Sequence, residues 1–134
     1  METFVDLNMG LDLTAVPDLK TVPEGLYNLR VESVESKVSQ NGNPYIALRF
    51  SFLDDPEAQD VYNNLMLPTA DNDQRTTLQK KRRIKKFVEE FSVPFTASGI
   101  NFENAIGCTG FALLIEEDTE DFGKQNRIRR FGRA

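Results

Sequence analysis

The sequence predicts an all-β domain with one helix. Apolar residues alternate with a period of two in five segments, the period becomes helical in a single segment, and turn residues separate the segments. With 134 residues and 40% apolar content, the chain can build one core. We therefore expect an N-terminal arm over residues 1–20 and one domain over residues 21–134.

The first two expected strands form a hairpin. The segment 25–38 follows a proline and a glycine and alternates apolar with polar residues up to Ser33, where the apolar parity shifts by one. Such a shift predicts a β-bulge. Asn41-Gly42-Asn43 predicts a tight turn, because Asn and Gly tolerate positive φ angles. The second strand, residues 44–53, then presents an apolar face to the core.

The remaining elements follow in order. A third strand is expected at residues 60–67 and a helix at residues 71–91, with Asp71 or Asp73 as its N-cap. The residues of the helix expected to face the core are Leu78, Ile84, Phe87, Val88 and Phe91. After a short turn at residues 102–105, we expect a fourth strand at 108–116, an acidic loop at 117–121 and a last strand at 125–131.

This order, with the helix between the third and fourth strands, matches a five-stranded OB-fold barrel. A small β-sandwich with one crossover helix would give the same order of elements.

The composition limits the catalytic and metal-binding chemistry that the chain can perform. The chain has no histidine, which excludes the Ser-His-Asp, Cys-His and histidine-zinc mechanisms. The single cysteine, Cys108, has no thiol partner for a disulfide or a zinc site. The carboxylates of Asp54, Asp55 and residues 116–121 suit Mg²⁺, but nothing in the sequence fixes their geometry. We expect no enzyme, no cofactor and no metal site.

The chain carries neither a signal-like N-terminus nor an apolar run long enough to cross a bilayer. We therefore expect a cytoplasmic protein without membrane contact. The arm over residues 1–20 is a candidate for contacts between subunits.

Several stretches resemble the OB-fold single-stranded DNA-binding proteins that phages encode. They are VPEGLYNLRVESVESKVSQNGNPYIALRFSF, the helix KKRRIKKFVEEF, the entry to the fourth strand at Gly107, and GKQNRIRRF. The resemblance covers residues 22–131. It implies a protein of the infected host cell's cytoplasm that coats and protects single-stranded DNA in replication or recombination, beside replication or recombination proteins. The chain departs from that pattern at its basic end, RIRRFGRA, where many such proteins carry an acidic tail.

Binding a single strand without sequence preference needs rings that stack on bases and cations along the phosphates. Alternation places Tyr45 and Arg49 on the outer face of the second strand and Tyr62 on that of the third. On the last strand, alternation places Arg127, Arg129 and Phe131 on one face, and two lysines flank turns near the expected groove. The expected site is Lys37, Tyr45, Arg49, Tyr62, Lys124, Arg127, Arg129 and Phe131.

Each assignment has an ordinary alternative. The tyrosines would otherwise fill a sheet face, and the arginines of the last strand would neutralise the acidic loop. A secondary basic surface on the helix serves either phosphate contact or solubility; it comprises Lys80, Lys81, Arg82, Arg83, Lys85 and Lys86. Phe50, Phe52, Phe87 and Phe111 are assigned to the core. The alternative function is a protein-interaction module of a phage replication or recombination complex without direct DNA binding.

Overall fold

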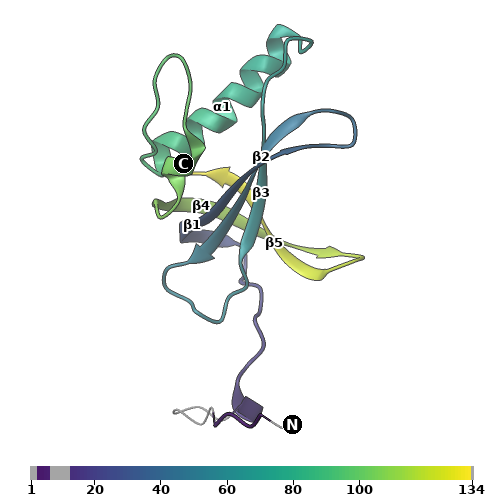
Figure 1. The fold of residues 1–134 in the computed structure, drawn as a ribbon, viewed down its shortest axis with the longest axis vertical. Helices are drawn as coiled ribbons and strands as arrows, with labels where there is room; N and C mark the ends of the chain where they lie inside the picture. Colours follow the sequence, from purple (N-terminus) through teal and green to yellow (C-terminus); the bar gives the residue numbers. More distant parts are fainter. Residues whose placement is uncertain (1–2, 7–12, 134) are drawn as a thin grey trace.

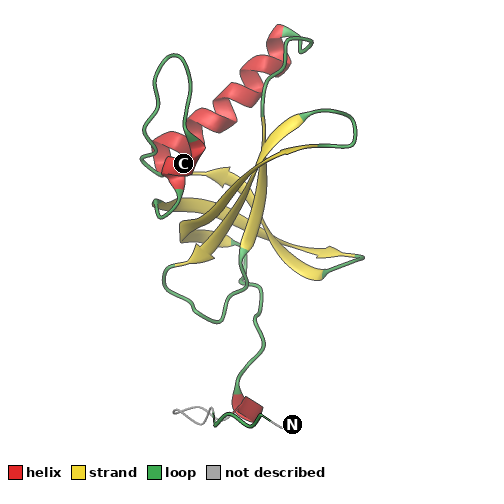
Figure 2. Ribbon diagram, in the orientation of Figure 1, coloured by secondary structure: helices red, strands yellow, loops and turns green. Residues whose placement is uncertain are grey.

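The computed structural model describes residues 3–6 and 13–133, so that parts of the expected arm and Ala134 lie outside the described residues. One long helix and five strands make up the domain (Figures 1 and 2). The elements in chain order are η1 (Leu13–Ala15), β1 (Gly25–Val38), β2 (Pro44–Phe52), β3 (Val61–Met66), α1 (Gln74–Glu90), η2 (Phe102–Ala105), β4 (Thr109–Thr119) and β5 (Gly123–Phe131). The prediction of a mostly β domain with its helix between the third and fourth strands is confirmed.

The five strands form one antiparallel sheet in the order β3-β2-β1-β4-β5. The sheet curves until its edge strands β3 and β5 lie beside each other (Figure 1), but no backbone ladder joins them. The expected closed barrel is therefore not formed. Gln59, just before β3, instead donates to the carbonyl of Lys124 across the seam at 2.9 Å. Arg83 of the helix covers the free edge of β5, where it donates to the carbonyls of Ile128 and Arg129 at 3.3 and 3.2 Å.

The expected bulge in β1 is confirmed. The pairing of β1 with β2 shifts register between Val31 and Ser33, where the apolar parity changes in the sequence. Leu29 and Val31 before the shift are fully buried, and Val34 packs against the core after it. The bulge keeps one face of this long strand apolar while the strand bends around the core.

Helix α1 begins after Asp73, whose carboxylate accepts a hydrogen bond from the backbone N–H of Thr76 at 2.7 Å. This is the N-cap that the sequence predicted. Ile84, Phe87 and Val88 are buried against the sheet. Leu78, however, is 41% exposed, because the first turns of the helix extend past the sheet (Figure 1).

Four phenylalanines form the centre of the core. Phe50 of β2, Phe87 and Phe91 of the α1 end and Phe131 of β5 are at most 2% exposed, and the centroids of their rings lie 5.1 to 6.2 Å apart. Gly110 makes room for the cluster, since a Cβ there would lie 2.9 Å from the ring of Phe91 and 3.0 Å from a backbone carbonyl. The cluster thus packs the end of the helix against both β2 and β5.

The main difference from the expected boundaries lies in the acidic segment. Strand β4 continues to Thr119, and Glu117 and Asp118 pair with Gln125 and Lys124 across the hairpin. The turn is short because Gly123 adopts a φ of 68°. Most of the expected acidic loop is therefore strand.

The chain enters the domain at residues 20–22. Lys20 pairs with Ala58 in a parallel bridge, and Val22 is buried. The side chain of Asn126 holds this entry: its Oδ1 accepts from the N–H of Val22 at 2.9 Å, and its Nδ2 donates to the carbonyls of Val22 at 2.8 Å and Ile115 at 3.2 Å. Within the described part of the chain, no helix is long and apolar enough to span a membrane.

We predict that Asn126→Ala lowers the free energy of unfolding by about 2 to 3 kcal/mol, because both backbone groups of Val22 lose their buried partner. Urea denaturation measures this change. Gln125→Ala is the matched control on the neighbouring residue, which is only half-buried, and should change stability by less than about 0.5 kcal/mol. Equal losses in the two variants would contradict the assigned role of Asn126.

Candidate functional site

Four of the sequence-predicted site residues share one face of the sheet. In the register of the strands, Lys37 lies opposite Tyr45, and Arg49 lies opposite Tyr62. The residues that alternate with them on β2 are buried in the core, so this face is the outer one. Met66, opposite Tyr45 on β3, belongs to the same face.

The two tyrosine rings and the Met66 side chain on this outer face are accessible to a ligand. Tyr62 is 62% exposed, Met66 is 36% exposed, and Tyr45 is half-buried. An exposed tyrosine on a sheet offers a flat surface for stacking without a rearrangement of the strand.

The cations on the outer face are engaged with carboxylates. Arg49 Nε lies 3.7 Å from Asp60, and Lys37 Nζ lies 3.7 Å from Glu35. The Lys37–Glu35 pair is exposed, and such pairs contribute little to stability, so a phosphate could replace Glu35 at small cost. Arg49 and Asp60 are only half-exposed, and the Nε of Arg49 is itself buried and makes no hydrogen bond.

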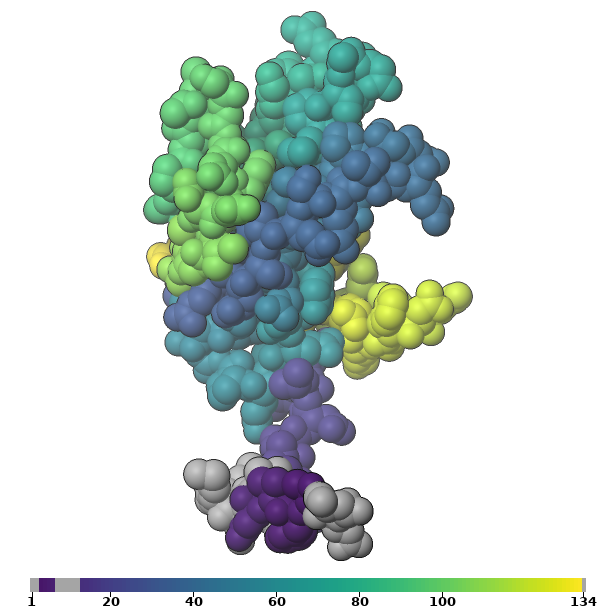
Figure 3. All heavy atoms as spheres, viewed as in Figure 1, coloured from purple at the N-terminus to yellow at the C-terminus, as the bar shows by residue number. Residues whose placement is uncertain are grey.

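Two hairpins flank this face and project to the same side of the molecule. Figure 3 shows the hollow between them, with the β1–β2 hairpin in blue above and the β4–β5 hairpin in yellow-green below. The tip of the β4–β5 hairpin carries Phe122, which is 75% exposed, and Val38 at the end of β1 is 67% exposed. We call the outer face of β1–β3 between these hairpins the hairpin groove.

The basic residues of β5 are placed less favourably for ligand binding than Lys37 and Arg49. Arg127 Nε pairs with Glu117 at 3.4 Å, and Arg129 pairs with Glu24 at 3.9 Å. Both carboxylates lie on the β4 and β1 side of β5, away from the tyrosines of β2 and β3. Arg127 and Arg129 are thus engaged with carboxylates, and Lys124 is exposed near the tip of the β4–β5 hairpin, opposite Asp118.

Phe131 is not a binding residue: it is 2% exposed and packs in the aromatic core. The expectation failed because β5 carries a bulge, which skips Arg129 in the pairing with β4 and turns Phe131 inward. Phe111, assigned to the core, is instead only partly buried, and the guanidinium of Arg133 lies 4.0 Å from its ring centroid.

The secondary basic surface divides into two groups. Lys80 bonds to Asn72 at 2.9 Å, and Arg83 lies 4.9 Å above the Phe131 ring while it donates to the edge of β5. Burial, and to a lesser extent the charge of Arg127, lowers the pKa of Arg83 below its ordinary value. These two residues serve the fold. The exposed members of the surface are Lys81, Arg82, Lys85 and Lys86.

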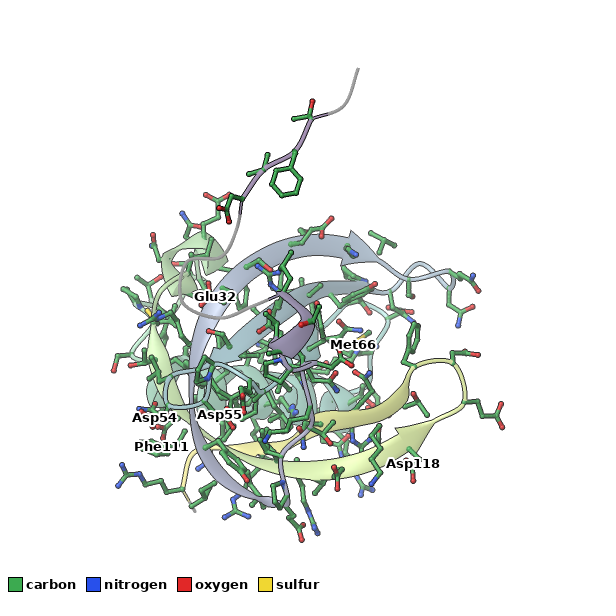
Figure 4. The ribbon with its side chains drawn as sticks, turned by 90° about the horizontal axis from the view of Figure 1, so that it is seen from below. Glu32, Asp54, Asp55, Met66, Phe111 and Asp118 are labelled. Atoms are coloured by element: carbon green, nitrogen blue, oxygen red, sulfur yellow. The ribbon has the colours of Figure 1, made fainter. Side chains whose placement is uncertain are left out.

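The carboxylates do not converge on one point. Figure 4 shows Asp118 on the projecting hairpin, well apart from Asp54 and Asp55. Among residues 3–6 and 13–133, no three acidic or thiol side chains are grouped to hold a metal ion. Lys124 opposite Asp118 and Arg127 beside Glu117 offset part of the negative charge of the β4–β5 hairpin.

Sequence reasoning missed Met66 and Phe122. In the sequence, alternation places Met66 on the same outer face of the third strand as Tyr62, which was the available signal. Phe122 stands between Asp121 and Gly123, and a ring at the tip of a hairpin has no core within reach. That position was the signal for an exposed aromatic residue.

Comparison with known proteins gives one family. The family model described as "Protein of unknown function (DUF669)" matches residues 10–107, which is more than half of the chain. The chain belongs to this family. A search of the curated proteins found no match.

The third tyrosine is held apart from the hairpin groove. The hydroxyl of Tyr27 donates to the carbonyl of Pro23 at 2.7 Å, and its ring meets the edge of Phe52 at 5.4 Å. Burial raises the pKa of Tyr27 above its ordinary value, and the carboxylates of Asp55 and Glu116 add to the shift.

We predict that Tyr27→Phe removes one phenol from an alkaline absorbance titration, and that the difference curve has its midpoint above the ordinary value of about 10. Because the folded-state pKa is raised, the stability from this phenol is fully present below the unfolded-state pKa and is lost as the pH rises through the folded-state pKa. A midpoint at or below the ordinary value would contradict this placement.

Proposed function

We propose that this member of the DUF669 family is an OB-fold protein that binds single-stranded DNA in the hairpin groove with little sequence preference. The observation that carries the proposal is the meeting of Tyr45, Tyr62, Lys37 and Arg49 on one outer face between two projecting hairpins. By coating the strand, the protein would protect it during phage replication or recombination, as its resemblance to phage proteins suggests.

The sheet topology supports the OB-fold assignment. The OB fold is a five-stranded, partly open Greek-key barrel, and it binds oligonucleotides on the face of its second and third strands and on the loops between strands 1 and 2 and strands 4 and 5. Here the order β3-β2-β1-β4-β5 brings β5 beside β3, and the hairpin groove uses the corresponding face and loops.

The side chains of the hairpin groove favour binding of the unpaired bases of a single strand over binding of a duplex surface. Stacking on a ring contributes about 1 to 3 kcal/mol per base, and it requires bases that are not paired inside a helix. Tyr45, Tyr62 and Phe122 offer three such rings. The acidic β4–β5 hairpin opposes the dense phosphates of duplex DNA, whereas a flexible single strand can direct its phosphates toward Lys37 and Arg49.

A second candidate is a protein-interaction module that uses the same barrel. The observation that favours it is the pairing of cations with carboxylates: Arg49, Arg127 and Lys37 each lie within 3.7 Å of an acidic side chain. The formal net charge of −5 points the same way. The two candidates differ in whether the rings of the hairpin groove contact bases.

We predict that a labelled oligo-dT binds the full-length protein, with a log–log salt slope of about −0.7 per phosphate contacted. Fluorescence polarisation measures this binding. Tyr45→Ala combined with Tyr62→Ala should weaken it by at least about tenfold, since each ring stacks with one base. Tyr27→Phe is the matched control, because Tyr27 lies off the groove, and should bind like the wild type. No binding at low salt would favour the interaction module.

We also predict that Phe122→Ala weakens oligo-dT binding by about fivefold or more while the midpoint of urea denaturation stays unchanged, because the ring is exposed at a hairpin tip. Ile106→Ala is the control, since Ile106 is another exposed apolar side chain, outside the hairpin groove. If the two variants lose affinity equally, the β4–β5 hairpin does not contact the DNA.

A further inference from the structure

A second groove lies at the helical end of the molecule. It is bounded by α1, the end of β3 and the segment 95–102, and it has a volume of about 450 Å³. Its floor is apolar and its rim is basic. The residues that define it are Leu67, Ile84, Phe95 and Phe102 on the floor and Lys81 and Lys85 on the rim. We call it the helix groove.

The helix groove exposes apolar surface that the fold does not use. Phe95 is 50% exposed, and Phe102 and Leu67 are only partly buried. Exposed aromatic side chains beside a concave apolar surface are typical of sites where a partner inserts its own apolar side chains. Lys81 and Lys85 are exposed on the same side, so the partner should be acidic.

The N-terminal arm has the complementary chemistry. Residues 1–20 contain the acids Glu2, Asp6, Asp12 and Asp18 and one basic residue, Lys20. Among the described residues of the arm, the large apolar side chains are exposed: Phe4 is 91%, Val5 63%, Leu13 66%, Val16 51% and Leu19 62% exposed. An acidic segment with exposed apolar side chains matches a basic groove with an apolar floor.

The arm and the helix groove lie at opposite ends of the molecule. The arm leaves the domain where Asn126 holds Val22, and it extends away from α1 (Figure 1). A contact between the two therefore joins different copies in a head-to-tail manner. A head-to-tail contact uses two different surfaces, so each added copy presents a free groove or a free arm to the next copy.

We propose that the N-terminal arm of one copy docks in the helix groove of the next copy, with its apolar side chains on the floor and its carboxylates beside Lys81 and Lys85. This contact leaves the hairpin groove open. It does not rest on the proposed DNA binding and is tested without DNA.

The first measurement is the polarisation of a labelled synthetic peptide of residues 1–20 added to the full-length protein. We expect binding that weakens with salt. Lys81→Glu with Lys85→Glu should weaken it by about tenfold, because two attractive pairs become repulsive. The matched control is Arg75→Glu with Lys86→Glu, which changes the charge of the same helix equally but leaves the lining of the helix groove intact. This control should bind the peptide like the wild type.

The second measurement is the sedimentation of the full-length protein over a range of concentrations. We expect the average mass to rise with concentration, and Phe4→Ser with Val5→Ser to reduce this rise without a change in urea denaturation, since both side chains are exposed. A monomer at every concentration would overturn the proposal, even if the peptide binds, because head-to-tail docking of the arm must raise the average mass. Equal loss in the charge-reversal variant and its control would also overturn it. Both measurements are made without DNA, so their outcome does not depend on the proposed DNA binding.

Discussion

The arrangement of this molecule depends on the contact of four phenylalanine rings. Phe50 lies near one edge of the sheet and Phe131 lies on the other, yet their ring centroids are 6.2 Å apart. Phe87 and Phe91 at the end of the helix contact both rings. Burying these rings requires the sheet to curve until β3 and β5 lie side by side. The hairpin groove is a consequence, since the same curvature makes both hairpins project to one side of the molecule (Figure 3).

The seam between β3 and β5 shows how the curvature is held without closure of the sheet. Gln59 and Arg83 donate to carbonyls along the open edge of β5, so that these acceptors are satisfied although no strand pairs with them. This role has a cost for binding. The fold holds the guanidinium of Arg83 over the Phe131 ring. Sequence alone counts Arg83 as a free cation, but it is not available to a ligand.

Much of the fold could be predicted because its signals are local. The parity shift after Ser33 located the bulge of β1, and Asp73 was visible as an N-cap. The bulge in β5 was hidden, because Arg129 and Arg130 are both polar and give no parity signal, so Phe131 was assigned to the wrong face. The exposure of Leu78, the open seam and the helix groove depend on distances between remote segments, which no periodicity encodes.

The charges of the hairpin groove decide how such a site can work. Its cations are paired with carboxylates, so most of the proposed affinity must come from stacking, which for three rings amounts to about 3 to 9 kcal/mol before the cost of association. Under the proposed function, one such site alone would hold a single strand weakly. Contacts between neighbouring copies raise the local concentration of sites along the strand and thus the total affinity, without a new contact to DNA. A weak, nearly neutral groove and a head-to-tail arm are therefore consistent with each other, because a protein that coats a strand needs many sites that exchange quickly and neighbours that keep them in place.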